Sequence, residues 1–244
     1  MLRKLLFVAL AITLTACGSK YPYSPNYVSP DTVSVRSIPV PPAPYSKEWY
    51  RDVDTVIASQ QNLSAETIAQ IKAEKPVLPE MLATDVLGAK VTAANYPVLF
   101  EFLKRTGSDS WRISDVTKDY WGTTRPYLMD KRIHLYAEPI TSHAYPSGHT
   151  TTNFVWAELL SELVPNAREA LYARALEVAQ HRVKGGVHYP HDLQGGQLLA
   201  REIVAKMKTI PQFQKDLNCV KTELRKQPIA YKKSCCKSHC KRKR

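Results

Sequence analysis

Apolar residues recur at helical spacing from Ser46 onward. In the first such stretch they lie at Trp49, Val53, Val56 and Ile57, three or four positions apart, so they share one face of a helix. Nowhere in the chain do apolar and polar residues alternate over a length that would predict a β-strand. The pattern therefore predicts an all-α domain over residues 46–226, long enough for a single compact helical bundle.

Serine and proline residues divide this domain into separate helices. Ser64 precedes the apolar pair Ile68 and Ile71, as an N-cap would. Prolines at positions 76, 79 and 97 separate the next helical pieces because proline disrupts a helix interior. The later predicted helices cover residues 110–124, the stretch between His149 and Pro165, residues 167–180, the stretch from after His188 to Met207, and residues 211–224.

The first 17 residues predict a secretory signal. Arg3 and Lys4 precede a short apolar run, which is typical of a signal peptide and too short for a permanent membrane span. The run ends in Leu-Thr-Ala-Cys, a pattern similar to a bacterial lipobox, so we expect lipidation at Cys17. Gly18 favours the outer membrane, and the expected location is the periplasm. An ordinary signal peptide with an incidental cysteine is the alternative.

Proline, serine and tyrosine dominate residues 18–45, which predicts an extended tether between the membrane and the domain.

Positive charge is concentrated at the two ends of the chain. Nine of the formal +12 charges belong to Arg3, Lys4 and the last thirteen residues. The remaining chain is only mildly basic, so nucleic-acid binding is not expected.

Residues 227–244 form a basic tail that contains three cysteines. The tail could bind anionic lipid or polymer, or hold a metal through Cys235, Cys236, His239 and Cys240. Adjacent cysteines without a CxxC pair make a poor zinc site, so we expect a disordered basic tail instead. Disulfides that include Cys219 stay open, because sequence alone cannot pair cysteines.

The densest candidate chemistry lies between His181 and Asp192. His188 precedes Asp192 by four residues, and a helix that begins near Tyr189 would bring the two side chains together. The carboxylate would then bind one imidazole nitrogen and leave the other free as a nucleophile. Arg182 offers a planar set of donors that suits an oxyanion. The alternative is two helices and a glycine turn whose polar residues cluster by chance.

Two further motifs add donors for an anion. Lys118 and Arg125 are seven residues apart, a spacing that would place both cations on one helical face. Pro146, Ser147, Gly148 and His149 form a turn before a predicted helix, which aims backbone N–H groups at an anion. Three cations, a helix N-terminus and two histidines are thus predicted to converge on one small anion.

The three motifs, K-x6-R-P, P-S-G-H and R-x5-H-x3-D, resemble the signature of the type 2 phosphatidic acid phosphatase (PAP2) superfamily, and the chain is most similar to bacterial class A non-specific acid phosphatases. The resemblance covers roughly residues 46–225. It implies that His188 is the nucleophile, Asp192 orients it and His149 is the acid. One departure is His181, which stands where the family usually has serine; we expect it to adjust packing or hydrogen bonding around Arg182. The implied phosphate-binding residues are Lys118, Arg125, Ser147, Gly148 and Arg182.

The implied reaction is hydrolysis of small phosphate monoesters through a phosphohistidine, with broad specificity, an acidic optimum and no metal or other cofactor. His143 and His191 fall outside the motifs and are expected either to lie behind the residues that touch the substrate or to be at the surface. A vanadate-dependent haloperoxidase or a lipid phosphate phosphatase could use the same pocket. A phosphate sensor without turnover is the alternative from another class. Assembly into a homo-oligomer stays open.

Overall fold

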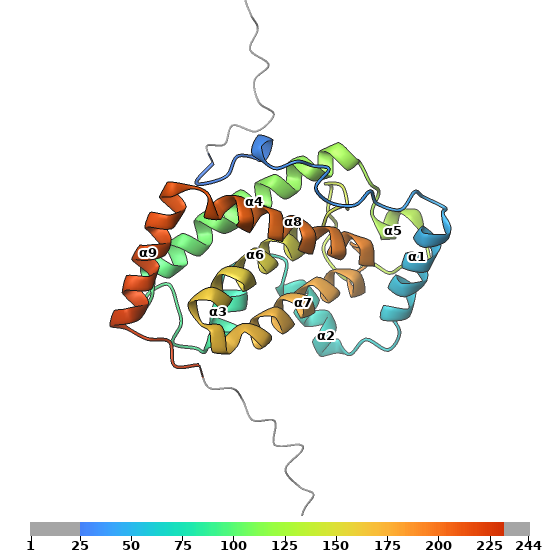
Figure 1. The fold of residues 1–244 in the computed structure, drawn as a ribbon. Coiled ribbons are helices and arrows are strands. Elements are labelled where there is room, and N and C mark those ends of the chain that lie inside the picture. The colour runs from blue at the N-terminus through green and yellow to red at the C-terminus, as the bar shows by residue number, and fades with distance from the viewer. Residues whose placement is uncertain (1–24, 232–244) are drawn as a thin grey trace, which may run out of the picture.

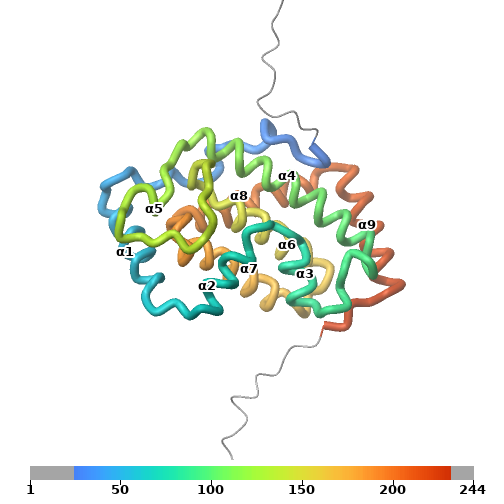
Figure 2. The backbone as a smooth tube through the Cα atoms, turned by 180° about the vertical axis from the view of Figure 1, so that it is seen from behind, coloured from blue at the N-terminus to red at the C-terminus, as the bar shows by residue number. Residues whose placement is uncertain are grey.

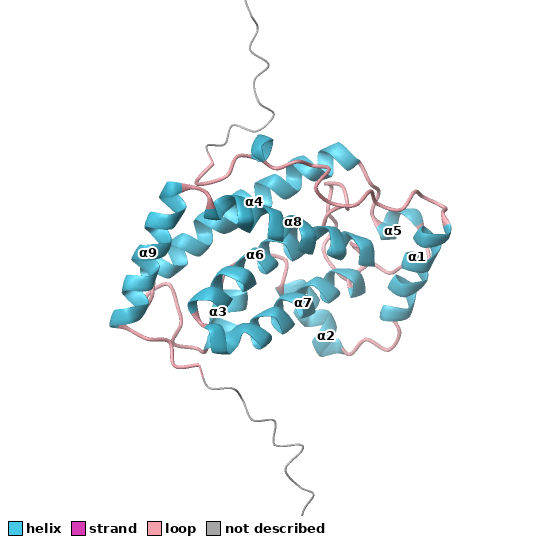
Figure 3. Ribbon diagram, in the orientation of Figure 1, coloured by secondary structure: helices cyan, strands magenta, loops and turns pink. Residues whose placement is uncertain are grey.

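The computed structural model describes residues 25–231 (Figure 1). The predicted signal peptide, Cys17 and the cysteines of the tail lie outside these residues. The described chain is built from helices joined by loops and contains no strand, so the all-α prediction is confirmed (Figure 3). None of the helices between residues 25 and 231 combines the length and the apolar character that a membrane crossing requires.

Short polar residues and prolines begin most helices where the sequence predicts them, but the helix predicted over residues 110–124 is wrong at its start, because the helix there begins at Pro97. Ser46, Ser64 and Ser147 are N-caps whose hydroxyl oxygens accept backbone N–H groups. The α-helices are α1 (Lys47–Ser59), α2 (Ala65–Ala73), α3 (Glu80–Leu87), α4 (Pro97–Trp121), α5 (Pro126–Met129), α6 (Gly148–Leu163), α7 (Arg168–Lys184), α8 (Pro190–Lys208) and α9 (Pro211–Lys226), and the 3₁₀ helices are η1 (Pro30–Thr32) and η2 (Pro165–Ala167).

Helix α6 lies at the centre of the bundle, in contact with α4, α7 and α8. Gly107 allows α4 to approach closely, because a Cβ atom there would lie 2.5 Å from the ring of Trp156 on α6. The Trp156 indole donates a hydrogen bond to the carbonyl of Leu103 at 2.8 Å. Helices α2 and α3 both lie against α7 (Figure 2). The segment between α2 and α3 can therefore reach the polar end of α7, where the candidate site lies.

The prediction of an extended tether over residues 18–45 is wrong for the described part, residues 25–45, which packs on the helical domain. Tyr27, Val28 and Ile38 are buried in the main hydrophobic core. The carboxylate of Asp109 on α4, itself fully buried, accepts the backbone N–H groups of Tyr27 at 2.7 Å and Val28 at 3.1 Å. Composition suggested a linker because the segment has no periodic apolar face, but Tyr27, Val28, Val33 and Ile38 are each buried, whereas Val40 and Tyr45 stay exposed.

Candidate active site

The start of α8 joins the predicted nucleophile to its partner. Tyr189 is the N-cap, and Asp192 at the third helical position accepts its backbone N–H at 2.9 Å. The same carboxylate oxygen accepts a hydrogen bond from His188 Nδ1 at 2.9 Å. This contact assigns the proton to Nδ1 and leaves a lone pair on Nε2. Nε2 lies 3.2 Å from Nη1 of Arg125, so His188 faces a cation at its free nitrogen.

The prediction that Lys118 and Arg125 share one helical face is wrong. Helix α4 ends at Trp121, and Gly122 follows with a φ of 61°, a left-handed conformation that suits glycine at a helix end. Arg125 lies beyond this turn in extended backbone, as the N-cap of α5. The turn still brings both cations to one place, because Lys118 Nζ at 3.1 Å and Arg125 Nη2 at 2.9 Å donate to the same carbonyl, that of His143.

The loop between α5 and α6 covers these cations. Lys118 also donates to the carbonyls of Ala144, at 2.9 Å, and Pro146. Arg125 Nε donates to the carbonyl of Ser142 at 2.8 Å. Both cations are almost completely buried. Backbone carbonyl oxygens therefore accept hydrogen bonds from Lys118 and Arg125 donors that could otherwise bind an anion.

The Pro-Ser-Gly-His turn is held against α8. The backbone N–H of Ser147 donates to the carbonyl of Asp192 at 3.0 Å, and the Ser147 hydroxyl caps α6. A Cβ on Gly196 of α8 would lie 2.9 Å from the Ser147 carbonyl oxygen, so only glycine allows this approach. A Cβ on Gly148 would meet the ring of Trp111 at 3.2 Å. The N-terminus of α6 thus lies directly beside His188 and Asp192.

His149 and Arg182 are held by the end of α2. Nε2 of His149 donates to the carbonyls of Glu74 and Lys75, both at 3.1 Å. Nη2 of Arg182 donates to the carbonyl of Ile71 at 2.6 Å. The buried Nε of Arg182 has no hydrogen-bond partner among the described residues. An anion that reached this point would find one donor already free.

Burial and repulsion between cations shape the electrostatics of the site. Burial, together with Arg125, lowers the pKa of Lys118 to about 7. Burial, together with Arg182, lowers the pKa of His149 to about 3. The pKa of His188 is also well below its usual value through burial and Arg125, although Asp192 opposes this. Lys118 disfavours protonation of both imidazoles, together with Arg182 at His149 and Arg125 at His188. The cluster therefore has an excess of positive charge that a bound dianion would relieve.

Three residues near the site carry no motif signal. Glu74 at the end of α2 accepts a hydrogen bond from His181 Nδ1 at 2.8 Å and from Arg174 Nη1 at 2.8 Å. His181, the departure from the usual serine, therefore binds the segment that holds His149 and lies beside Arg182, whose Nη2 is 3.9 Å from Glu74. Nε2 of His191 lies 3.1 Å from Oδ1 of Asp192. The described residues contain no group of His, Cys, Asp and Glu side chains placed to hold a metal ion.

The chain is similar in sequence to the PAP2 superfamily and to curated acid phosphatases. A family model described as the PAP2 superfamily matches residues 110–215, a range that contains every catalytic and phosphate-binding residue predicted from the motifs. The non-specific acid phosphatase of Salmonella typhimurium is 30% identical over 174 residues, which cover 68% of this chain and 64% of that protein. The non-specific acid phosphatase of Providencia stuartii is 36% identical over 83 residues, 34% of each chain. The acid phosphatase of Zymomonas mobilis is 26% identical over 149 residues, 57% of this chain and 54% of that protein.

Each of these matches spans less than two thirds of the relative's own length. Among solved structures, a transmembrane PAP2-type phosphatidylglycerolphosphate phosphatase from Bacillus subtilis resembles the chain with a TM-score of 0.48 and 16% identity. That likeness covers 68% of this chain and 87% of the other.

Proposed function

Because residues 110–215 form a domain of the PAP2 superfamily, we propose that this protein hydrolyses phosphate monoesters to an alcohol and inorganic phosphate. The observation that carries the proposal is the orientation of His188. Its Nδ1 donates to Asp192 at 2.9 Å, and its Nε2 lies 3.2 Å from a guanidinium nitrogen of Arg125. A phosphoryl oxygen bound to Arg125 would bring the phosphorus atom close to the Nε2 lone pair.

The proposed reaction has two steps. In the first, Nε2 of His188 attacks phosphorus, the bond from phosphorus to the ester oxygen breaks, and His149 gives that oxygen a proton. The product is an alcohol and a phosphohistidine. In the second step, His149 takes a proton from water, whose oxygen attacks phosphorus and releases phosphate from His188.

The positive charge that neutralises the phosphoryl oxygens would come from the protein itself. Lys118, Arg125 and Arg182 would contact the phosphoryl oxygens, together with Ser147 and the N–H of Gly148 at the start of α6. Three side-chain cations and a helix N-terminus balance a dianion, so the proposal requires no metal ion. In the structure most of these donors bind backbone carbonyls. The substrate would therefore exchange carbonyl oxygens for phosphoryl oxygens.

Release of phosphate from p-nitrophenyl phosphate, measured with and without EDTA, tests the proposal. We expect hydrolysis that EDTA leaves unchanged. A vanadate-dependent haloperoxidase would instead oxidise bromide when supplied with vanadate and peroxide. A lipid phosphatase would prefer phosphatidate in vesicles to the soluble ester. A phosphate-binding protein without turnover would bind phosphate and release none.

A further inference from the structure

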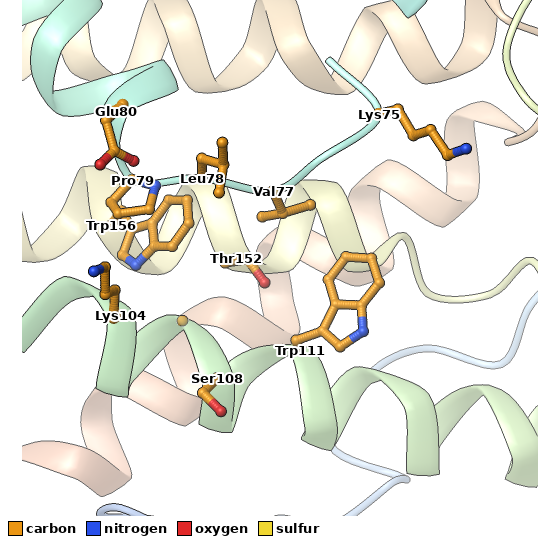
Figure 4. Close-up of a pocket in the computed structure, with 11 residues that line it drawn as sticks. Lys75, Val77, Leu78, Pro79, Glu80, Lys104, Ser108, Trp111, Thr152 and Trp156 are labelled. Carbon is orange, nitrogen blue, oxygen red and sulfur yellow. The ribbon is translucent and has the colours of Figure 1, made fainter. Parts of the chain in front are cut away.

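An open groove is lined by the segment between α2 and α3, by α4 and by α6 (Figure 4). Its cavity volume is about 730 Å³, within the range of small-molecule sites. Trp111 and Leu78, which both line the groove, are 37% and 47% exposed, which is unusual for large apolar side chains. The other apolar lining residues are Val77, Pro79 and Trp156.

Two contacts connect this groove to His149. The ring of Trp111 packs edge-to-face on the His149 imidazole, with 5.6 Å between the ring centres. Lys75 lines the groove, and its carbonyl accepts the hydrogen bond from His149 Nε2 at 3.1 Å. A group that displaces this carbonyl from His149 would therefore extend along Trp111 into the groove.

We propose that the groove binds the alcohol part of the substrate and selects phosphate monoesters of aromatic alcohols. This inference rests on the proposed function. In an in-line displacement the leaving oxygen lies opposite the attacking atom, here His188 Nε2, and next to the acid, here His149. The alcohol would then lie against Trp111 and Leu78, and an aromatic ring would cover both apolar side chains.

Substrate preference in two variants tests the groove. Leu78→Ser and Trp111→Ala are compared with Leu176→Ser, which changes a leucine on α7 that is 40% exposed and outside the groove. The measured quantity is the ratio of kcat/KM for 1-naphthyl phosphate to that for glycerol 2-phosphate. We expect the ratio to fall about tenfold in both groove variants and to stay unchanged in the control. Leu78 has no ring contact with His149, so its variant separates lost substrate contact from a disturbed acid.

The substrate ratios separate a wrong groove assignment from a wrong proposed function. Hydrolysis with the same substrate ratio in all variants would overturn the groove assignment and leave the proposed function standing. If the unmodified protein hydrolyses neither ester, the proposed function is wrong and this inference is wrong with it.

A different observation supports a second inference, about His191. Its Nδ1 hydrogen-bonds to Asp52 on α1, and its Nε2 lies 3.1 Å from Oδ1 of Asp192. The second contact is an ion-pair distance and not an aligned hydrogen bond, because Oδ1 of Asp192 has no hydrogen-bond partner among the described residues. A ring that lies between two carboxylates is still favoured in its charged form. The rings of Tyr189, which is stacked on His191 with 5.2 Å between centres, and Tyr145, at 5.7 Å, complete its surroundings.

We infer that His191 is a positioning residue for the nucleophile. Its charge faces Asp192 on the side opposite His188, so it keeps the carboxylate ionised and in place. It also competes with His188 for the negative charge of Asp192. Together with Arg125 and Lys118, which face His188 from the other side, it keeps His188 neutral and able to attack.

The two carboxylates outweigh burial and raise the pKa of His191 to about 9. Loss of this positive charge would make protonation of His188 easier, so the pKa of His188 would rise. The acid limb of the kcat profile, which reports the enzyme–substrate complex, should then move to higher pH.

His191→Gln keeps a donor but removes the charge, and His134→Gln is the matched control because His134 is exposed. We expect the acid limb of kcat to move upward by roughly one pH unit in His191→Gln alone. NMR titration of the ring protons tests the charge without any activity measurement. We expect the resonance that disappears in His191→Gln to titrate near pH 9 in the unmodified protein. Titration near its ordinary value, or an unmoved acid limb, would overturn the inference.

Discussion

Nδ1 of His188 lies 2.9 Å from Oδ2 of Asp192, one turn further along the chain. Asp192 also accepts the backbone N–H of Tyr189, the N-cap of α8. The carboxylate that binds the imidazole is therefore held in place by the first turn of this helix. Neither the ring nor the carboxylate can turn without loss of a buried hydrogen bond. The free nitrogen, Nε2, is therefore held in one direction before substrate arrives.

Loss of His188, the proposed nucleophile, should abolish turnover. For His188→Ala we expect kcat to fall by roughly 10⁴ or more, because no other group can form the covalent intermediate. Asp192→Asn should reduce kcat by roughly 10²–10⁴ through loss of ring orientation. Enzyme quenched with labelled substrate should carry phosphate that is labile in acid and stable in base. His134→Ala, an exposed histidine, is the control, and substantial activity in His188→Ala would contradict the covalent mechanism.

Anion binding should be coupled to proton uptake by His149. Its pKa of about 3 means that the free enzyme holds it neutral at pH 6, whereas a bound dianion favours the imidazolium. Sulfate does not change its own protonation at this pH. Calorimetry of sulfate binding at pH 6 in buffers of different ionisation enthalpy should show uptake of about one proton. His149→Gln should abolish the uptake, and binding without any proton change would contradict this account.

Hydrolysis should follow a bell-shaped pH profile with an optimum of roughly pH 5–7. The rate falls at low pH as His188 becomes protonated, and at high pH as His149 in the complex loses its proton. Vanadate should inhibit competitively as a mimic of the transition state. An alkaline optimum with activity restored only by zinc or magnesium would place the reaction in a metal-dependent class.

Asp109 should hold the N-terminal segment on the body of the protein. Asp109→Ala removes the acceptor for the N–H groups of Tyr27 and Val28, so we expect the free energy of unfolding to fall by about 2–4 kcal/mol. Urea denaturation measures this change, and hydrogen exchange at the two amides should accelerate. Asp31→Ala, at an exposed position in η1, should change neither. Equal stability in both variants would support a loosely attached segment.

We propose that the mature protein is acylated at Cys17 and is anchored on the periplasmic side of the outer membrane. Cys17→Ser should prevent acylation and the normal lipoprotein cleavage. Membrane fractionation and mass spectrometry of the N-terminus measure both effects. A soluble wild-type protein with an unmodified N-terminus would show that the lipobox interpretation is wrong.

The sequence by itself determined the helical class and most helix boundaries, because apolar spacing, N-caps and prolines act within a few residues of where they stand. It also predicted the pairing of His188 with Asp192, because a carboxylate in the first turn of a helix can reach the residue just before the N-cap. It failed for Lys118 and Arg125, where Gly122 ends the helix between them. Residue spacing predicts geometry only while the helix continues.

Only the tertiary structure decided what surrounds these motifs. The groups that bind His149 and Arg182 are backbone carbonyls at the end of α2. Every residue has a backbone carbonyl, so the residue types in the sequence do not indicate which carbonyls will accept these hydrogen bonds. Asp52 meets His191 across 139 positions of the chain, and Glu74 meets His181 across 107. Such contacts depend on how α1, α2, α7 and α8 pack, because burial forces the few polar groups between these helices to find partners in one another.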